Sequence, residues 1–173
     1  EKAHKLDWDI DPDRLVVTGL ARFDTLVARN REIPDDPKRM VYMPTWRDDA
    51  DPDALRRAIG GLLADLALHA LLERHDARLD VFLHVNFGRA LREEIAVAHG
   101  GRVRFPAVSD PQALFAQAGL LITDYSSVAW DMLYIDKPVI FYQFDADRFA
   151  DARGGYLEPD QLPGPLARDP GAL

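Results

Sequence analysis

The sequence predicts an α/β fold in which helices flank a parallel sheet. Short apolar runs alternate with longer segments of helical periodicity, and the connections between them are short. Buried parallel strands have this continuous apolar character, and strands joined through helices pair in parallel. We therefore expect a Rossmann-like sheet with flanking helices, built as a single domain over residues 1–173.

Strands are predicted where a short apolar run has a defined end. The β-branched run at 15–19 closes on Gly19, and the run at 40–43 is stopped by Pro44. Further apolar runs predict strands at 81–85, 103–105, 120–123 and 138–142.

Helices are predicted where apolar residues recur at helical spacing between these strands. The segments are 23–29, 52–75, 90–98, 111–118 and 128–134, and Gly60-Gly61 is expected to break the longest one. Residues 145–173 contain several Pro and Gly residues and no clear strand. They predict an irregular tail packed on the domain, with one short helix near 147–152.

Composition excludes several classes of protein. The absence of cysteine excludes disulfides and cysteine-based sites, and the net charge of -8 argues against broad binding of nucleic acid. No apolar run reaches the length of a membrane span, and no signal peptide opens the chain. Because the first residue is Glu1 rather than Met, we expect a piece of a longer protein.

Polar residues follow several predicted strands at their carboxyl ends, where parallel sheets bind ligands. They lie at 43–47, at His84 and at 123–127. The first N–H groups of a helix lack partners and carry partial positive charge, so Ser126 and Ser127 at the start of a helix predict a phosphate site. The alternative, that both serines only cap their own helix, stays open on this observation.

Taken in order, five motifs resemble those of the CDP-glycerol glycerophosphotransferases, the bacterial teichoic-acid polymerases and primases. They are TGLARFD at 18–24, MPTWRD at 43–48, LITDYSS at 121–127, DKPVIFY at 136–142 and LPGP at 162–165. The resemblance implies transfer of a polyol phosphate from a CDP donor to a hydroxyl of a lipid-linked or polymeric acceptor. It also implies the GT-B architecture of two Rossmann-like domains, of which this chain would be the carboxyl-terminal, donor-binding one.

The resemblance suggests roles for the residues around the serines. Ser126 and Ser127 would cradle the donor pyrophosphate and stabilise the charge that builds as CMP leaves. Thr123 belongs to the same turn. A carboxylate repels phosphate, so Asp124 is expected to orient the turn or a donor hydroxyl.

Two arginines are further candidates for the donor site. Arg47 would bind phosphate bidentately, with a surface ion pair to Asp48 or Asp49 as the equal alternative. Arg22 would approach the cleft, with a pair to Asp24 as the alternative. The neighbour of Arg47, Trp46, is predicted to pack structurally rather than to stack on a base.

His84 is the catalytic candidate. The family has a His-Pro pair at this strand end, and here Val85 replaces the proline. The imidazole would donate a hydrogen bond or a proton to the leaving phosphate, and a purely structural histidine is the alternative. The family's other catalytic histidine lies in the amino-terminal domain, which no segment here matches. We therefore expect this chain alone to bind donor without turnover.

Two other functions stay open. One is the donor domain of a nucleotide-sugar glycosyltransferase or epimerase, disfavoured by the lack of a Gly-rich donor loop, and the other is a non-catalytic α/β module. No cofactor is expected, and a divalent cation is compatible with the sequence but not required. The expected partners are CDP-glycerol or CDP-ribitol and a polyol acceptor. The expected location is cytoplasmic, at the inner face of the membrane, with membrane contact only through regions outside this chain.

Overall fold

The computed structural model describes residues 11–14, 16–47, 52–87, 93, 101–106, 110–153 and 157–173. In this part of the chain, six parallel strands form one sheet in the order β3-β2-β1-β4-β5-β6. The strands are β1 Asp36–Met43, β2 Arg78–Val81, β3 Val103–Arg104, β4 Ala118–Thr123, β5 Val139–Tyr142 and β6 Leu166–Ala167. This order confirms the predicted Rossmann-like class, and the direction of winding reverses between β1 and β4.

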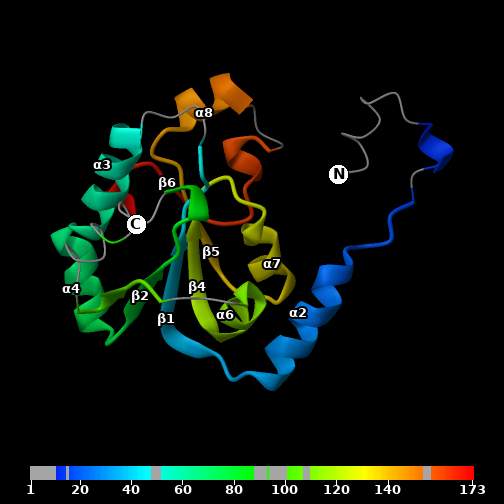
Figure 1. Cartoon of the computed structure of the whole chain (residues 1–173), viewed down its shortest axis with the longest axis horizontal. Coiled ribbons are helices and arrows are strands. Elements are labelled where there is room, and N and C mark those ends of the chain that lie inside the picture. The colour runs from blue at the N-terminus through cyan, green and yellow to red at the C-terminus, as the bar shows by residue number, and fades with distance from the viewer. Residues whose placement is uncertain are drawn as a thin grey trace.

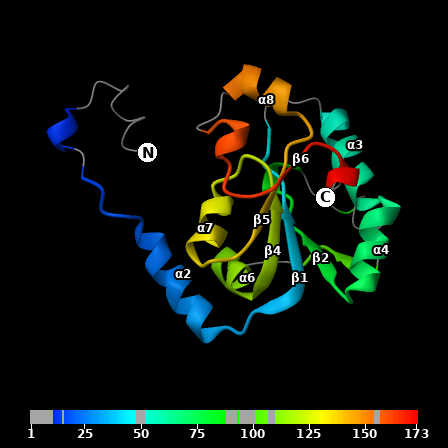
Figure 2. The ribbon, with the colours of Figure 1, turned by 180° about the vertical axis from the view of Figure 1, so that it is seen from behind.

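Helices cover both faces of the sheet (Figures 1 and 2). One face carries α2 Ala21–Glu32, α6 Pro111–Gln117 and α7 Val128–Tyr134, and the other carries α3 Pro52–Leu63 and α4 Leu66–Arg74. The helix α8 Ala146–Arg153 lies across the edge where the strands end. Short 3-10 turns occur at η1 Pro12–Arg14, η2 Val85–Phe87, η3 Pro159–Gln161 and η4 Pro170–Ala172.

The hydrophobic core is divided by the sheet into two clusters. Successive side chains of a strand point to opposite faces, so Tyr42 and Ile122 enter the cluster under α3 and α4. Val41 and Leu121 enter the cluster under α2, α6 and α7. Burial on both faces explains why these strands are continuously apolar in sequence.

The helical predictions at 23–29, 111–118, 128–134 and 147–152 are confirmed by α2, α6, α7 and α8. The predicted break at Gly60-Gly61 is wrong, because α3 continues through both glycines to Leu63. The break comes instead after Leu63, and the next helix, α4, is capped by Asp65, whose carboxylate accepts the N–H of Leu68 at 2.9 Å. The predicted helix at 90–98 lies outside the described residues apart from Glu93, which is helical.

Three strand predictions need correction. Residues 16–19 form no strand: Val16 and Val17 are 77% and 78% exposed, and this segment leads away from the sheet (Figure 2). β-branched residues form a strand only where a neighbour supplies hydrogen bonds, and here none of the described strands pairs with them. The strand predicted at 81–85 ends at Val81, and the tail does contain a strand, since β6 pairs with β5.

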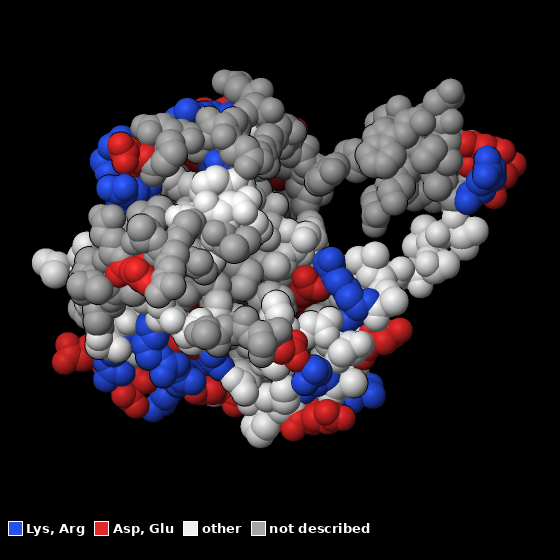
Figure 3. Space-filling view, in the orientation of Figure 1, with Lys and Arg blue, Asp and Glu red and all other residues white. Residues whose placement is uncertain are grey.

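Ion pairs gather near the amino ends of β1 and β2. Asp36 lies 2.6 Å from Arg78, and Asp76 lies 2.7 Å from Lys38 and 3.1 Å from Arg102. Basic and acidic side chains accordingly lie intermixed over the lower part of the molecule in Figure 3. The charges of this region neutralise one another locally.

Gly164, in the segment before β6, passes close to the backbone of β5. A Cβ at this position would collide with the carbonyl oxygen of Val139. Because backbone atoms cannot move aside as a flexible side chain does, we expect Gly164→Ala to lower the free energy of unfolding by about 1–3 kcal/mol. Urea denaturation measures this change. Gly60→Ala is the control, since open space surrounds Gly60 in α3 and alanine there should raise stability by about 1 kcal/mol. Equal losses in both variants would contradict the packing argument.

Candidate functional site

The candidate site lies beyond the carboxyl ends of β1 and β4, where the strand order reverses. Met43 and Thr123, the last residues of the two strands, are register partners. Residues 44–47 and 124–127 therefore leave the sheet side by side. Crevices that bind ligands form at such positions in open α/β sheets.

Asp124 joins these two loops. It is 2% exposed and accepts the Thr45 N–H at 3.0 Å and the Thr45 hydroxyl at 2.5 Å. It also accepts the N–H of Tyr125 at 2.7 Å. This geometry fits the turn-orienting role, and contact with a donor hydroxyl stays a prediction.

Arg47 is the last residue of the loop at 44–47, and its guanidinium is buried. Nη2 lies 2.8 Å from Asp124, Nε lies 2.7 Å from Asp145, and Nη1 donates to the Thr45 carbonyl at 2.6 Å. Burial acts to lower the pKa of Arg47, but the charges of Asp124 and Asp145 outweigh it and the pKa is raised. In the structure, the ion-pair partners are the buried carboxylate of Asp124 and the partly buried carboxylate of Asp145. The alternatives Asp48 and Asp49 lie outside the described residues, and phosphate binding by Arg47 stays a prediction.

An aromatic shell surrounds this ion cluster. The ring of Tyr125 stacks on Phe149 of α8 with a centroid distance of 3.5 Å and an interplanar angle of 3°. The Arg47 guanidinium carbon lies 5.4 Å from the first ring, 5.7 Å from the second and 5.0 Å from the ring of Phe144. Burial, with a smaller contribution from Asp145, raises the pKa of Tyr125, so its hydroxyl remains protonated. α8 and the loop after β5 are thereby fastened to the loop after β4.

The two serines are not used as strong caps. Ser127 occupies the N-cap position of α7 without a side-chain cap hydrogen bond, so the capping alternative is wrong for this residue. Ser126 Oγ accepts the Val128 N–H only at 3.5 Å, a long contact. The structure therefore leaves both hydroxyls able to serve a ligand, and their contact with pyrophosphate stays a prediction.

Two other candidate residues make contacts that differ from those expected. The Thr123 side chain is fully buried and donates to the Met43 carbonyl at 2.7 Å, so its hydroxyl joins β4 to β1 instead of facing a ligand. Arg22 pairs with Asp131 of α7 at 2.9 Å rather than with Asp24. Burial of the Asp131 carboxyl raises its pKa despite this partner.

His84 lies three residues beyond β2, in the connection rather than at the strand end. It is exposed, and its Nδ1 accepts the Asn86 N–H at 3.2 Å. Trp46 packs edge-on against Phe87 with a centroid distance of 4.9 Å, which confirms its structural packing. This contact brings the loop after β1 against the connection that carries His84. The catalytic role of His84 stays a prediction.

Asp145 and Phe149 were not found from the sequence. Asp145 follows β5, the next strand at the same edge of the sheet, so its position was a usable signal. No sequence signal pointed to Phe149, because its contact with Tyr125 depends on how α8 folds back over that edge of the sheet.

Comparison with known proteins identifies the chain's relatives. Residues 2–173 match the family model described as CDP-Glycerol:Poly(glycerophosphate) glycerophosphotransferase. The chain belongs to this family. The match runs through all five motifs and both loops of the site.

Individual members of the glycerophosphotransferase family are similar along most of this chain. A teichoic acid glycerol-phosphate transferase of Staphylococcus aureus is 29% identical over 96% of this chain and 45% of its own length. A teichoic acid poly(glycerol phosphate) polymerase of Bacillus subtilis is 32% identical over 83% of this chain and 19% of its own length. The solved wall teichoic acid polymerase TagF superposes with a TM-score of 0.67 at 28% identity, covering 94% of this chain and 42% of that chain. The chain thus spans less than half the length of these relatives.

Among the described residues of this glycerophosphotransferase family member, no group of three or more His, Asp or Glu side chains could hold a metal ion. Within that same part of the chain, none of the helices has the length and apolar character needed to cross a bilayer.

Proposed function

We propose that this chain forms the donor-binding half of a CDP-glycerol glycerophosphotransferase. The observation that carries the proposal is the pair of loops after β1 and β4, where the strand order reverses. Asp124 binds Thr45 and Arg47 and so joins the two loops, and the second loop carries Ser126 and Ser127. A rigid loop with two hydroxyl donors is suited to bind pyrophosphate, because donors already in place do not have to be ordered by the ligand.

In the proposed reaction, an acceptor hydroxyl attacks the phosphorus that carries glycerol and passes its proton to a base in the family's amino-terminal domain, outside this chain. The bond from this phosphorus to the bridging oxygen breaks, and CMP leaves with the electron pair. Ser126 and Ser127 would hydrogen-bond the charge that develops on the leaving phosphate. His84 would donate a hydrogen bond or proton to it.

The partners follow from the family. We propose a CDP-glycerol donor, with CDP-ribitol as a variant of the same chemistry, and a polyol acceptor that is polymeric or lipid-linked. A variant of TagF, 26% identical to this chain with a TM-score of 0.62, was solved after a CDPG soak. We also propose a cytoplasmic location at the inner face of the membrane, where a lipid-linked acceptor is reached.

Ligand selectivity tests this proposal. Because a ligand that binds only the folded state raises the melting temperature, CMP and CDP-glycerol should stabilise the chain, whereas UDP-glucose and GDP should not. Thermal shift measurements at matched concentrations compare the four ligands. Stabilisation by UDP-glucose alone would favour the nucleotide-sugar alternative, and no stabilisation by any of them would favour the non-catalytic module.

Removal of the serine hydroxyls should weaken donor binding. Hydrogen bonds to a charged group are strong, so we expect Ser126→Ala and Ser127→Ala each to raise the Kd for CDP-glycerol about tenfold. Isothermal titration calorimetry measures the change. Thr25→Ala, which removes an exposed hydroxyl from α2, is the matched control and should leave the Kd unchanged. Unaltered affinity in the double serine variant would overturn the assignment of the pyrophosphate site.

A further inference from the structure

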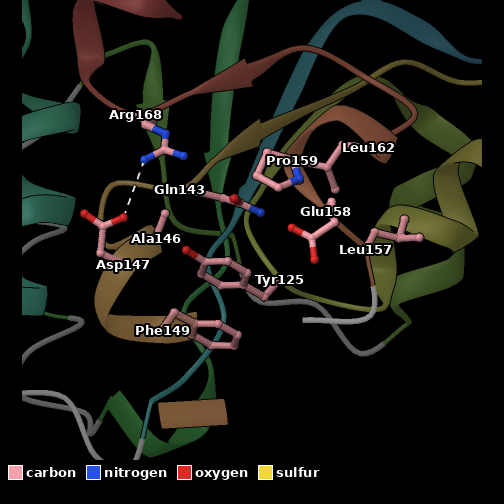
Figure 4. Close-up of a pocket in the computed structure, with 10 residues that line it drawn as sticks. All are labelled: Tyr125, Gln143, Ala146, Asp147, Phe149, Leu157, Glu158, Pro159, Leu162 and Arg168. Atoms are coloured by element: carbon pink, nitrogen blue, oxygen red, sulfur yellow. Dashed lines mark ion pairs between the residues drawn. The ribbon is translucent and has the colours of Figure 1, made fainter. Parts of the chain in front are cut away.

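A cavity of 230 Å³ lies beside the proposed pyrophosphate site (Figure 4). Its wall includes Tyr125, the residue between Asp124 and Ser126, and Gln143, which follows β5. The side-chain amide of Gln143 donates to the Asp124 carbonyl at 3.4 Å. The same residues therefore shape the cavity and hold the loop that carries the serines.

One wall of the cavity is an aromatic platform. The stacked rings of Tyr125 and Phe149 form it, and Arg47 and Asp145 hold it from behind. Leu157, Pro159 and Leu162 add apolar surface around the opening. Such surfaces make good contact with the C–H groups of a ligand, and a rigid platform loses little entropy when a ligand binds.

Polar groups stand around this platform. Figure 4 shows Gln143 above the Tyr125 ring, Glu158 to its right, and the ion pair of Asp147 with Arg168, 3.7 Å apart, to its left. The lining thus carries two carboxylates and one cation. Its net negative charge repels a pyrophosphate, whereas carboxylate and amide oxygens accept hydrogen bonds from hydroxyl groups.

The volume restricts the ligand further. Pockets for drug-sized molecules measure about 300–1,000 Å³, so a cavity of 230 Å³ lies below that range and has room for a small ligand. A three-carbon polyol combines small size, several hydroxyl donors and an apolar C–H face.

We propose that this cavity is a polyol subsite, in which Glu158 accepts hydroxyl hydrogen bonds and the Tyr125–Phe149 pair contacts the carbon chain. The inference rests on the proposed function, because the phosphate of the ligand is taken to lie at Ser126 and Ser127. A polyol reaches the cavity from either of two sources, the glycerol end of the donor or the terminal glycerol unit of the acceptor.

Titration of CDP, CDP-glycerol and a short glycerol phosphate oligomer tests the subsite. The unaltered chain should bind CDP-glycerol about five- to tenfold more tightly than CDP, the increment of one charge-assisted hydrogen bond with its apolar contacts. Glu158→Gln keeps the size of the side chain and removes its charge, and should reduce this ratio to about one to two. Phe149→Leu, which removes one ring of the platform, should reduce it as well.

Asp160→Asn is the matched control, because Asp160 lies in the same turn as Glu158 but does not line the cavity. A loss of the CDP-glycerol preference places the donor's polyol in the cavity. An unchanged preference with weaker binding of the oligomer places the acceptor's polyol there. Equal behaviour of E158Q, F149L and D160N with all ligands would overturn the subsite, whereas failure of CDP itself to bind the unaltered chain would overturn the proposed function. If CDP does not bind, the subsite is tested separately by the amide NMR signals of Gln143 and Glu158. Shifts of these signals on addition of the oligomer would support the subsite, and unchanged signals would count against it.

Discussion

Replacement of Asp124 by alanine is expected to lower the free energy of unfolding by about 3–5 kcal/mol. The reason is that the guanidinium of Arg47 is 3% exposed and loses one of its two carboxylate partners. The N–H and hydroxyl of Thr45 lose their acceptor at the same time. A buried donor without a partner retains the full cost of its lost hydration.

A double-mutant cycle, with each variant unfolded by chemical denaturant, separates the contribution of the Arg47 ion pair from that of the Thr45 hydrogen bonds. In Asp124→Ala, the buried Arg47 guanidinium keeps only one carboxylate partner, Asp145. Arg47→Met removes this guanidinium. The double variant should therefore be more stable than the sum of the single changes predicts, with a coupling of about 1–3 kcal/mol. Asp36→Ala removes a partly exposed ion pair with Arg78 and should cost about 0–1 kcal/mol. Strict additivity in the cycle would show that the two side chains act separately.

The sequence predicted those parts of the fold that depend on local pattern. The loop at 124–127 was found because an apolar run ends there and a helix begins, and both features appear in the structure as β4 and α7. The two-sided burial of the sheet follows from the same apolar runs. Where the pattern depends only on neighbours along the chain, the prediction was confirmed, except at Gly60-Gly61, where α3 continues through both glycines.

Failures occurred where a distant segment decides the outcome. Val16 and Val17 have strand character, but strand formation needs a partner, and these residues are exposed. The carboxylates considered for Arg47, as the alternative to phosphate, were next to it in sequence, whereas its partners Asp124 and Asp145 are 77 and 98 residues away. Side-chain pairs of this kind follow from the sheet topology, which brings the ends of β1, β4 and β5 together. The order of parallel strands is not encoded in any one local pattern.

A second buried charge lies away from the site, and its removal should also be costly. Asp80 of β2 is fully buried and lies 2.6 Å from Arg39 of β1 and 2.8 Å from Arg104 of β3. We expect Asp80→Asn to lower the free energy of unfolding by about 3 kcal/mol, because Arg39, whose side chain is 12% exposed, loses its counter-charge. Urea denaturation measures the loss.

Asp76→Asn provides the comparison for this change. Asp76 also binds two cations, Lys38 and Arg102, but its side chain is 67% exposed, so water replaces the lost partners and the effect should be much smaller. Its φ of 49° is one that asparagine tolerates, so the control adds no backbone strain. Equal losses in the two variants would show that burial does not determine the cost.

The double variant Arg39→Met with Asp80→Leu replaces both charges by apolar side chains. Comparing its stability with that of Asp80→Asn distinguishes the cost of breaking the ion pair from the cost of replacing it. Apolar side chains of similar size avoid the cost of burying charge, so most of the stability lost in Asp80→Asn should return. Arg104 remains half exposed and is hydrated without its partner. CMP affinity per folded molecule should stay unchanged in this variant, because the ion pairs of Asp80 join β1, β2 and β3 through strand residues and involve none of the loop residues 44–47 and 124–127. A loss of affinity here would mean that the ion pairs of β2 position the binding loops, and that the site extends into the interior of the sheet.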